Sequence, residues 1–229
     1  MSKIIERGQP GNGLEAAELF GGVAKPRWYR GMSWFDLDGQ LVWRADEVEL
    51  VTASPVRSGG PIREGLELSG AWWRTLNTSL DNLAGQHTTR IATPDTETIT
   101  QALVTATVEK VFGPEVDTTV TDYEWVPAHA DLTWANVTHP ECCLLDWEDH
   151  GRAPRGLDSA MLWIGSVGIA GLAERVRHER RTDLNTRPGR VMALFCCAKI
   201  LADSSTPQLL VTPTRAVADD LLDQLRRSR

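Results

Sequence analysis

A short segment of this chain carries the residue types that phosphoryl transfer needs. In that reaction a carboxylate must accept or orient the proton of the attacking hydroxyl, and oxygen ligands must hold Mg²⁺ on the phosphates of the nucleotide. A loop with Asp131 and, five residues later, Asn136 could present such a base together with a metal ligand. A strand over Cys143–Leu145 could then end in a second metal ligand, Asp146. The spacing therefore predicts a site for phosphoryl transfer within this segment.

Two motifs stand in order within this segment. The first is His129-x-Asp131-x-x-x-x-Asn136, and the second is Leu144-Leu145-Asp146-Trp147-Glu148. They resemble the catalytic loop and the metal-binding strand of the aminoglycoside phosphotransferase and choline kinase-like enzymes, which are relatives of the protein kinases. A weaker resemblance extends from Trp72 to about Leu201. The stretch directly after the motifs also looks like that of the family, at Gly151, Pro154, Gly156 and Asp158.

The resemblance implies a role for each motif residue. Asp131 would be the catalytic base or the group that orients the hydroxyl, and Asn136 and Asp146 would bind the magnesium ions that bridge the phosphates of ATP. His129 would mainly support the structure of the loop. Asp158 opens the next helix, and because aspartate is a common cap at a helix start, we expect it to cap that helix.

Four nearby side chains have two interpretations each. Glu148 could approach the second metal ion or lie in its outer shell. Trp134, inside the first motif, could line the substrate pocket or pack beneath it. Arg152 and Arg155 could contact phosphate or substrate, but we favour their interpretation as exposed surface arginines.

The elements that would position these residues begin with a helix and a hairpin. Residues 12–20 look helical and end at the glycine pair 21–22. Two strands, over Arg27–Phe35 and Leu41–Val51, are joined by a turn of the type that favours a β-hairpin. Residues 52–65 are rich in Pro, Gly and Ser, and they predict a boundary or a mobile loop.

Beyond this boundary the pattern becomes helical. The first helix would place its apolar side chains on one face, at Trp72, Trp73, Leu76, Leu80 and Leu83. A second helix opens at Thr93-Pro94, with proline in its first turn, and stops at Gly113-Pro114. Three or four more helices are expected, near residues 157–181, 188–203 and 213–227.

Together with the resemblance, these elements imply an α+β, protein-kinase-like two-lobe fold. A reduced, β-containing N-lobe would cover residues 1–57. A mostly helical C-lobe would cover residues 58–229 and would carry the catalytic loop and the metal-binding strand.

The expected N-lobe departs from the family pattern. Family members carry a Gly-rich loop over the phosphates, then a strand lysine and a helix glutamate that pairs with it. Our alignment leaves only Met1 to Gly11 for everything upstream, so the hairpin that covers the phosphates is expected to be missing. Lys3, with Glu15 as its partner, is the candidate pair for binding the nucleotide. Lys25 is a competing candidate for the lysine.

Composition limits the other function classes. A formal net charge of −7 and a pI near 5.3 argue against a general nucleic-acid binder, which would need a basic face. The apolar runs are shorter than the roughly 20 residues needed to cross a bilayer, and the first residues do not read as a signal peptide. The four cysteines form two adjacent pairs, which fits neither zinc spacing nor a disulfide framework. We therefore expect a cytoplasmic protein whose cysteines are small buried side chains.

The leading prediction is an ATP- and Mg-dependent O-phosphotransferase. Its partner would be a small-molecule hydroxyl acceptor, typically an aminoglycoside-like antibiotic or another amino alcohol, and neither nucleic acid nor a membrane. A homodimer that covers the edge of a shortened sheet is also expected, because unpaired strand edges tend to be covered. The alternatives are a catalytically incomplete kinase-like binding protein and a kinase that acts on peptide Ser or Thr.

Overall fold

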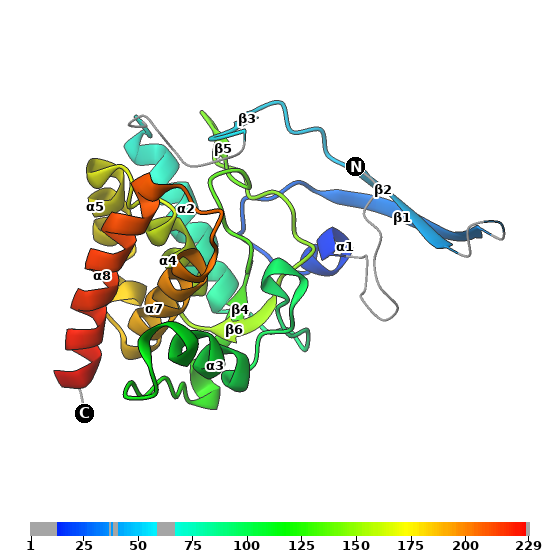
Figure 1. Cartoon of the computed structure of the whole chain (residues 1–229). Coiled ribbons are helices and arrows are strands. Elements are labelled where there is room, and N and C mark those ends of the chain that lie inside the picture. The colour runs from blue at the N-terminus through cyan, green and yellow to red at the C-terminus, as the bar shows by residue number, and fades with distance from the viewer. Residues whose placement is uncertain (1–12, 37, 39–40, 59–66, 228–229) are drawn as a thin grey trace.

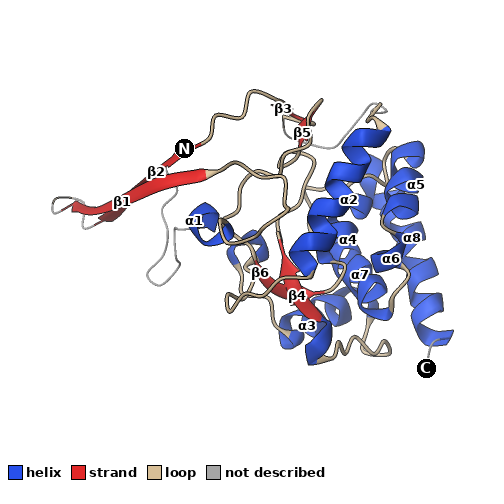
Figure 2. Ribbon diagram, turned by 180° about the vertical axis from the view of Figure 1, so that it is seen from behind, coloured by secondary structure: helices blue, strands red, loops and turns tan. Residues whose placement is uncertain are grey.

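The structure is a computed structural model that describes residues 13–36, 38, 41–58 and 67–227. The helices gather into one body, and a long β-hairpin projects from one side of it (Figure 1). Seen from behind, short strands lie between the helices and the hairpin (Figure 2). The elements confirm the α+β prediction, and their three small sheets each have two antiparallel strands.

The described N-terminal part consists of one short helix and the hairpin: α1 (Gly13–Ala17), β1 (Trp28–Asp36) and β2 (Leu41–Val48). β1 pairs antiparallel with β2, and Trp34 lies opposite Trp43. The predicted helix and hairpin are thus confirmed. Both α1 and β2 end earlier than expected, since residues 18 and 19 form a turn and the strand stops at Val48.

α1 touches the second motif through its backbone. A Cβ on Gly13 would collide with the carbonyl oxygen of Trp147 and the backbone of Glu148, so only glycine fits at this approach. Further along the helix, Glu15 binds Arg44 of β2, with 2.7 Å between Oε2 and Nη2. α1 therefore joins the hairpin to the segment that follows Asp146.

The first long helix is α2 (Gly70–Ala84), and it buries the predicted apolar face. Ser69 caps it, because its Oγ accepts from the backbone N–H of Trp72. The next helix, α3 (Gln101–Phe112), was expected to open at Thr93-Pro94, and this expectation is wrong. Residues 94–96 form a separate 3₁₀ turn in which Asp95 has a φ of 55°, a left-handed conformation that cannot continue a helix.

Five helices complete the described body: α4 (Leu157–Ile164), α5 (Ala170–Glu179), α6 (Arg181–Leu184), α7 (Arg187–Ala202) and α8 (Gln208–Arg227). Three or four helices were expected here, and the described residues form five, because the segment near 157–181 is divided into separate short helices. α7 is the central element, since it packs against α3, α4, α6 and α8. Cys196 and Cys197 lie buried within it, and Cys142 is buried elsewhere in the core.

The remaining strands are short. β4 (Trp125–Ala128) pairs with β6 (Gly151–Pro154), and β3 (Ser54–Pro55) pairs with β5 (Thr138–His139). The strand expected at Cys143–Leu145 is not formed, because Leu144 makes only an isolated bridge with Val137. In the part of the chain that the structure describes, no helix combines the length and the apolar character needed to cross a membrane.

Candidate active site

The first motif leaves β4 through a sharp turn that a buried carboxylate holds. Ala130 has a φ of 68°, and the N–H groups of His129 and Ala130 both donate to Asp158, at 2.8 Å to Oδ2 and to Oδ1. Asp158 stands in the first turn of α4, but the residue at the cap position is Gly156. The expectation that Asp158 caps its helix is therefore wrong. Its carboxylate instead holds the loop that carries Asp131.

Burial changes the protonation of this carboxyl group. Removal from water raises the pKa of Asp158 from 3.8 to about 6, although the two backbone N–H bonds act in the opposite direction. The neighbouring Asp183 raises this pKa further, and Arg180 lowers it. Asp158 is thus a buried acid whose two oxygens both accept hydrogen bonds from the loop.

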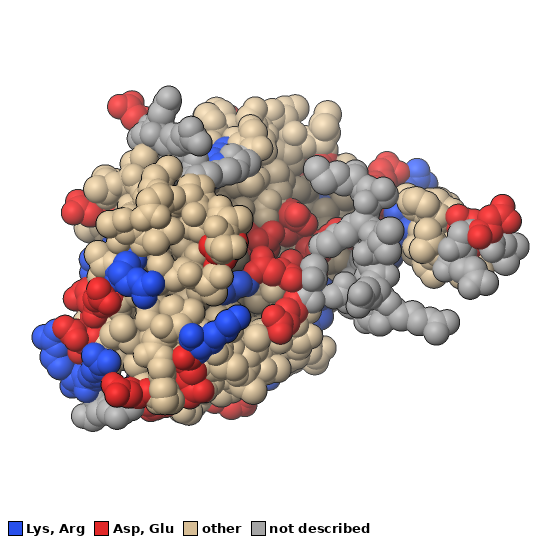
Figure 3. Space-filling model, viewed as in Figure 1, with Lys and Arg blue, Asp and Glu red and all other residues tan. Residues whose placement is uncertain are grey.

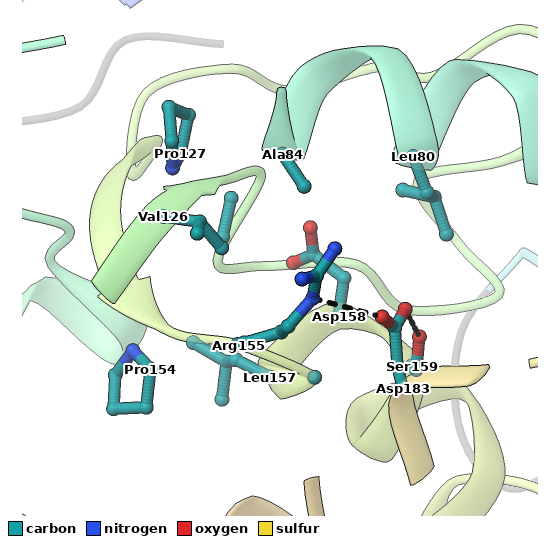
Figure 4. A pocket seen from close by; sticks show the side chains of 12 residues that line it. Leu80, Ala84, Val126, Pro127, Pro154, Arg155, Leu157, Asp158, Ser159 and Asp183 are labelled. Atoms are coloured by element: carbon teal, nitrogen blue, oxygen red, sulfur yellow. Dashed lines mark hydrogen bonds and ion pairs between the residues drawn. The ribbon is translucent and has the colours of Figure 1, made fainter. Parts of the chain in front are cut away.

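A polar network surrounds the base of α4. Arg180 is only 2% exposed, and it binds Asp183, Asp81 of α2 and Ser159 of α4. Figure 4 shows Arg155 reaching Asp183, with 3.3 Å between Nε and Oδ1, beside Asp158. Four of the network residues, Arg155, Asp158, Ser159 and Asp183, line a cavity of about 20 Å³, which is room for one water molecule. The network fixes α2, α4 and α6 around the carboxylate that holds the loop.

Asp131 and Asn136 are bound to each other. Asn136 Nδ2 donates both to the backbone carbonyl of Asp131 and to its Oδ2, each at 2.8 Å. Two backbone bonds through Thr133 close the turn between them. Because the amide nitrogen of Asn136 makes both bonds, its amide oxygen is the atom suited to bind a cation.

Asp146 is positioned by the residue that precedes it. The N–H of Leu145 donates to the carbonyl of Asn136 at 2.8 Å, and the carbonyl of Leu145 lies 2.7 Å from Nε2 of His129. Asp146 itself has a φ of 59°, and its charge acts on the pKa of His129. The structure therefore brings the two motifs into contact at Leu145, and a shared site would require such a contact.

His129 is completely buried and supports this junction. Its ring lies 4.7 Å from the ring of Trp147, centroid to centroid. Burial lowers the pKa of His129 to about 4, so the imidazole is neutral at pH 7. A neutral ring that bonds to the carbonyl of Leu145 joins the first motif to the second.

Only two side chains of the motifs are candidate ligands for a metal ion. Among the residues that the structure describes, no group of three or more His, Cys, Asp or Glu side chains could hold a metal ion. Asn136 and Asp146 would supply one amide and one carboxylate oxygen. Magnesium commonly keeps several waters and is bound by one or two carboxylates together with substrate phosphates, so a two-residue set fits magnesium on a nucleotide.

One arginine that the sequence patterns did not single out also holds the second motif. Arg90 donates from Nη2 to the carbonyl of Glu148 at 2.7 Å and from Nε to that of His150 at 3.1 Å. Arg90 lies far from both residues along the chain and belongs to no motif, so no local signal marks it. The sequence did single out Asp158, but the preference of aspartate for helix caps predicted a different role for it.

Two of the three residues predicted as candidates for binding the nucleotide, Glu15 and Lys25, lie within the described part of the chain. Lys3 lies outside the described residues. Glu15 binds Arg44, as described above. The side chain of Lys25 is 7% exposed and binds Glu18, with 2.9 Å between Nζ and Oε2. This bond lowers the pKa of Glu18. Next to Lys25, the carbonyl of Ala24 accepts from Leu144 N at 2.7 Å.

Trp134 packs inside the body. Its ring stacks on Trp72, with 6.1 Å between centroids, and meets Trp73 edge to face, while its Nε1 donates to Ser166. Trp73 in turn lines a groove of about 550 Å³, a volume in the range of ligand pockets. The other lining residues come from the segment before α2 and from α5 and its approach: Glu67, Leu68, Ile169, Gly171, Leu172 and Arg175.

Both expected surface arginines are paired. Arg152 lies 3.2 Å from Asp122, Nη2 to Oδ1, and Arg155 binds Asp183. Acidic side chains gather on the face of the molecule between the body and the hairpin (Figure 3). An acidic surface concentrates cations, among them a metal ion or an amine.

No model of a known protein family, no curated protein and no solved structure matches this chain. The functional argument therefore starts from the geometry of the two motifs.

Proposed function

We propose that this chain is a protein-kinase-like phosphotransferase that uses ATP and Mg²⁺ to transfer the γ-phosphoryl group to a hydroxyl of a small molecule. The observation that carries the proposal is the junction of the two motifs at Asn136. Its side chain holds Asp131 at 2.8 Å, and its carbonyl holds the residue directly before Asp146 at 2.8 Å. One base and two oxygen ligands thus come from two neighbouring turns.

Each side chain has a role that follows from its contacts. Asp131 would orient the acceptor hydroxyl and receive its proton, while Asp158 keeps the backbone behind it fixed. Asn136 and Asp146 would hold the metal through oxygen atoms. Bound magnesium ions neutralise the charge that develops on the phosphates. Lys3 with Glu15, or the buried Lys25, would position the nucleotide.

The groove beside Trp73 supports an amino-alcohol acceptor. Trp73 contacts Trp134, which stands three residues after Asp131 in the catalytic loop. Glu67 at the groove gives a carboxylate for an amino group, whereas the guanidinium of Arg175 binds Glu179 at 2.6 Å. The acceptor class we propose is an aminoglycoside-like antibiotic or another amino alcohol.

The test is transfer of labelled γ-phosphate from ATP to a panel of amino sugars, antibiotics, small amino alcohols and Ser- or Thr-containing peptides. Asp131→Asn should lower the rate by about 10²–10⁴-fold, the scale of general-base catalysis. Asp220→Asn is the matched control, because Asp220 lies on α8 and accepts a bond from Gln224. Absence of transfer to every acceptor, or equal rates for Asp131→Asn and the wild type, would contradict the proposal.

A second candidate is a kinase-like binding protein without turnover. The observation that favours it is the small sheet beside α1, in which the described residues form only two strands. Calorimetric titration with Mg·ATP separates the two candidates. Binding that is lost in Asp146→Ala and accompanied by transfer supports the enzyme, while binding without transfer to any acceptor supports the second candidate.

A further inference from the structure

The backbone that follows Asp146 is bound by a segment from a distant part of the chain. The carbonyl oxygens of Glu148, Asp149 and His150 follow one another, and each accepts a hydrogen bond from residues 90–93. Arg90 donates from Nη2 to Glu148 at 2.7 Å and from Nε to His150 at 3.1 Å. The N–H of Thr93 donates to the carbonyl of Asp149 at 3.0 Å. One guanidinium therefore holds two carbonyls that are two residues apart.

The main chain of Arg90 is itself fixed, so its side chain starts from a defined position. Its carbonyl accepts from the N–H of Arg152 at 2.8 Å, and Ile91 forms a parallel bridge with Arg152. A Cβ on Gly151 would collide with the backbone of Ile91 and Ala92. The two main chains are therefore in direct contact next to the carbonyls that Arg90 holds.

Asp146 stands between this bound backbone and a second point of support. On its upstream side, both backbone groups of Leu145 are bonded, as described above. On its downstream side, the carbonyl of Trp147 lies 2.6 Å from Nδ1 of His150, and the carbonyl of His150 is one of the two that Arg90 holds. Asp146 has a φ of 59°, and a residue other than glycine keeps such a conformation only where its surroundings enforce it. The bonds on both sides supply that enforcement.

Arginine suits this position in a way that lysine does not. A guanidinium presents its N–H groups in a rigid planar fork, whereas the lysine ammonium is a single nitrogen on a flexible chain. Burial lowers the pKa of Arg90, but arginine stays protonated in proteins, so both bonds come from a charged donor and are stronger than neutral ones. A lysine at this position could bind one of the two carbonyls but not both at once.

We propose that Arg90 is a positioning residue for Asp146: by holding the carbonyls of Glu148 and His150, it keeps the Asp146 carboxylate in the orientation that binds Mg²⁺. The inference rests on the proposed function, because it takes Asp146 as a metal ligand. In this role Arg90 touches neither the metal nor the nucleotide. Without its two bonds, the backbone of Asp146 leaves its left-handed conformation more often. The metal then binds more weakly, while a site that has bound its metal works as before.

The experiment measures binding of Mn²⁺ to the full chain in the presence of ATP, by electron paramagnetic resonance. Mn²⁺ is the probe because it takes the same oxygen ligands as Mg²⁺. Arg90→Lys should weaken Mn²⁺ binding by about tenfold or more, as changes in the groups that orient a metal ligand do. In the transfer assay, the Mg²⁺ concentration that gives half the maximal rate should rise by the same factor, while the rate at saturating Mg²⁺ should stay within about threefold of the wild type. A saturated rate that falls as far as the affinity would overturn the inference, because it would indicate general damage to the fold.

Arg187→Lys is the matched control. Arg187, at the start of α7, also holds the carbonyls of two residues that are two apart, Asp117 and Thr119. The loop that it holds belongs to neither motif. The change therefore removes the same kind of bonds and should leave Mn²⁺ affinity unchanged. Thermal melting of both variants shows that they are folded.

A measurement on the wild type alone tests the inference even if Arg90→Lys does not fold. Coupling between two sites is reciprocal, so bound metal must strengthen the bonds of Arg90 by the factor that these bonds add to metal affinity. Exchange of the Arg90 Nε–H with water, followed by nuclear magnetic resonance, should therefore slow by about tenfold when Mg·ATP is added.

Three further results would overturn the inference and leave the proposed function in place: unchanged Mn²⁺ affinity in Arg90→Lys, an equal loss in Arg187→Lys, or an Nε–H exchange rate that Mg·ATP does not alter. A wild type that binds no Mn²⁺ with ATP would overturn the inference and the proposed function together. Loss of Mn²⁺ affinity in Arg90→Lys, in a chain that transfers phosphate to no acceptor, would support the inference and assign the chain to the binding-protein candidate.

Discussion

Apolar side chains are buried in the helical body and exposed in the hairpin. In α7 every residue from Pro188 to Ala198 except Arg190 is buried, whereas no residue of β1 or β2 is. Elements with many buried contacts open rarely, and elements with few open easily. The loop with Asp131 is anchored in the buried body and therefore has a rigid support, whereas the hairpin has no buried residue of its own to hold it.

The largest expected difference between the two regions is in the cost of removing side-chain atoms. Leu194→Ala, at a fully buried position of α7, should lower the free energy of unfolding by about 2–5 kcal/mol. Val42→Ala, on the exposed hairpin, should change it by less than about 0.5 kcal/mol. Urea denaturation of both variants measures the two values. Equal losses of stability in the two variants would show that the body and the hairpin do not differ in packing.

The two regions should also respond to pH with opposite sign. The pKa of Asp158 is raised, so its contribution to stability is present below its unfolded pKa of 3.8 and is lost as the pH rises through about 6. In the hairpin, burial acts to raise the pKa of Asp46, but bonds from Arg44 and Trp28 leave it lowered. The contribution of Asp46 is therefore present above pH 3.8 and is lost as the pH falls through its folded pKa.

Urea titrations between about pH 2 and 7, with nuclear magnetic resonance of the two carboxyl groups, measure both effects. The contribution of Asp158 should be on the order of 3 kcal/mol, from a shift of about two pKa units. Asp158→Asn should remove this pH dependence. It should also destabilise the loop, because the amide turns one N–H group toward the two that Asp158 accepts. An unchanged pH profile in this variant would assign the dependence to another group.

The smallest expected difference concerns two glycines. Gly156 has a φ of 91°, and an added Cβ would lie 2.8 Å from the backbone of Gly189, so Gly156→Ala should cost about 1–3 kcal/mol. A Cβ on Gly31 of the hairpin would meet the ends of Asp46 and Arg44, which can move aside. Gly31→Ala should therefore cost less than about 1 kcal/mol. Thermal melting of the two variants compares them, and a larger loss at Gly31 would show that the hairpin is the more rigid region.

The features that the sequence predicted correctly are those set by local patterns. α2 follows from apolar side chains at helical spacing, and the hairpin follows from a turn between two strands. α3 was placed too early because the Pro94 signal is genuine for a helical turn, but Asp95 ends that turn at once. The expected strand at Cys143–Leu145 failed for a different reason: the N–H of Leu144 bonds to Ala24, far away in the sequence.

For the site, the sequence supplied residue types and order but not their supports. Asp158 accepts from two N–H groups that lie 28 and 29 residues before it. A rule for helix caps concerns only neighbouring residues, so it cannot predict such a contact. Arg90 and the buried Arg180 act over similar or longer separations. Lys3 and its pairing with Glu15 stay a prediction, since Lys3 lies outside the described residues.

The contact at Gly13 has a mechanical consequence. Where side chains separate two segments, small displacements are absorbed by rotamer changes. Here the main chain of α1 rests directly on the main chain of Trp147 and Glu148, with no side chain between them as a cushion. A movement of α1 would therefore displace the backbone of Trp147, which directly follows Asp146.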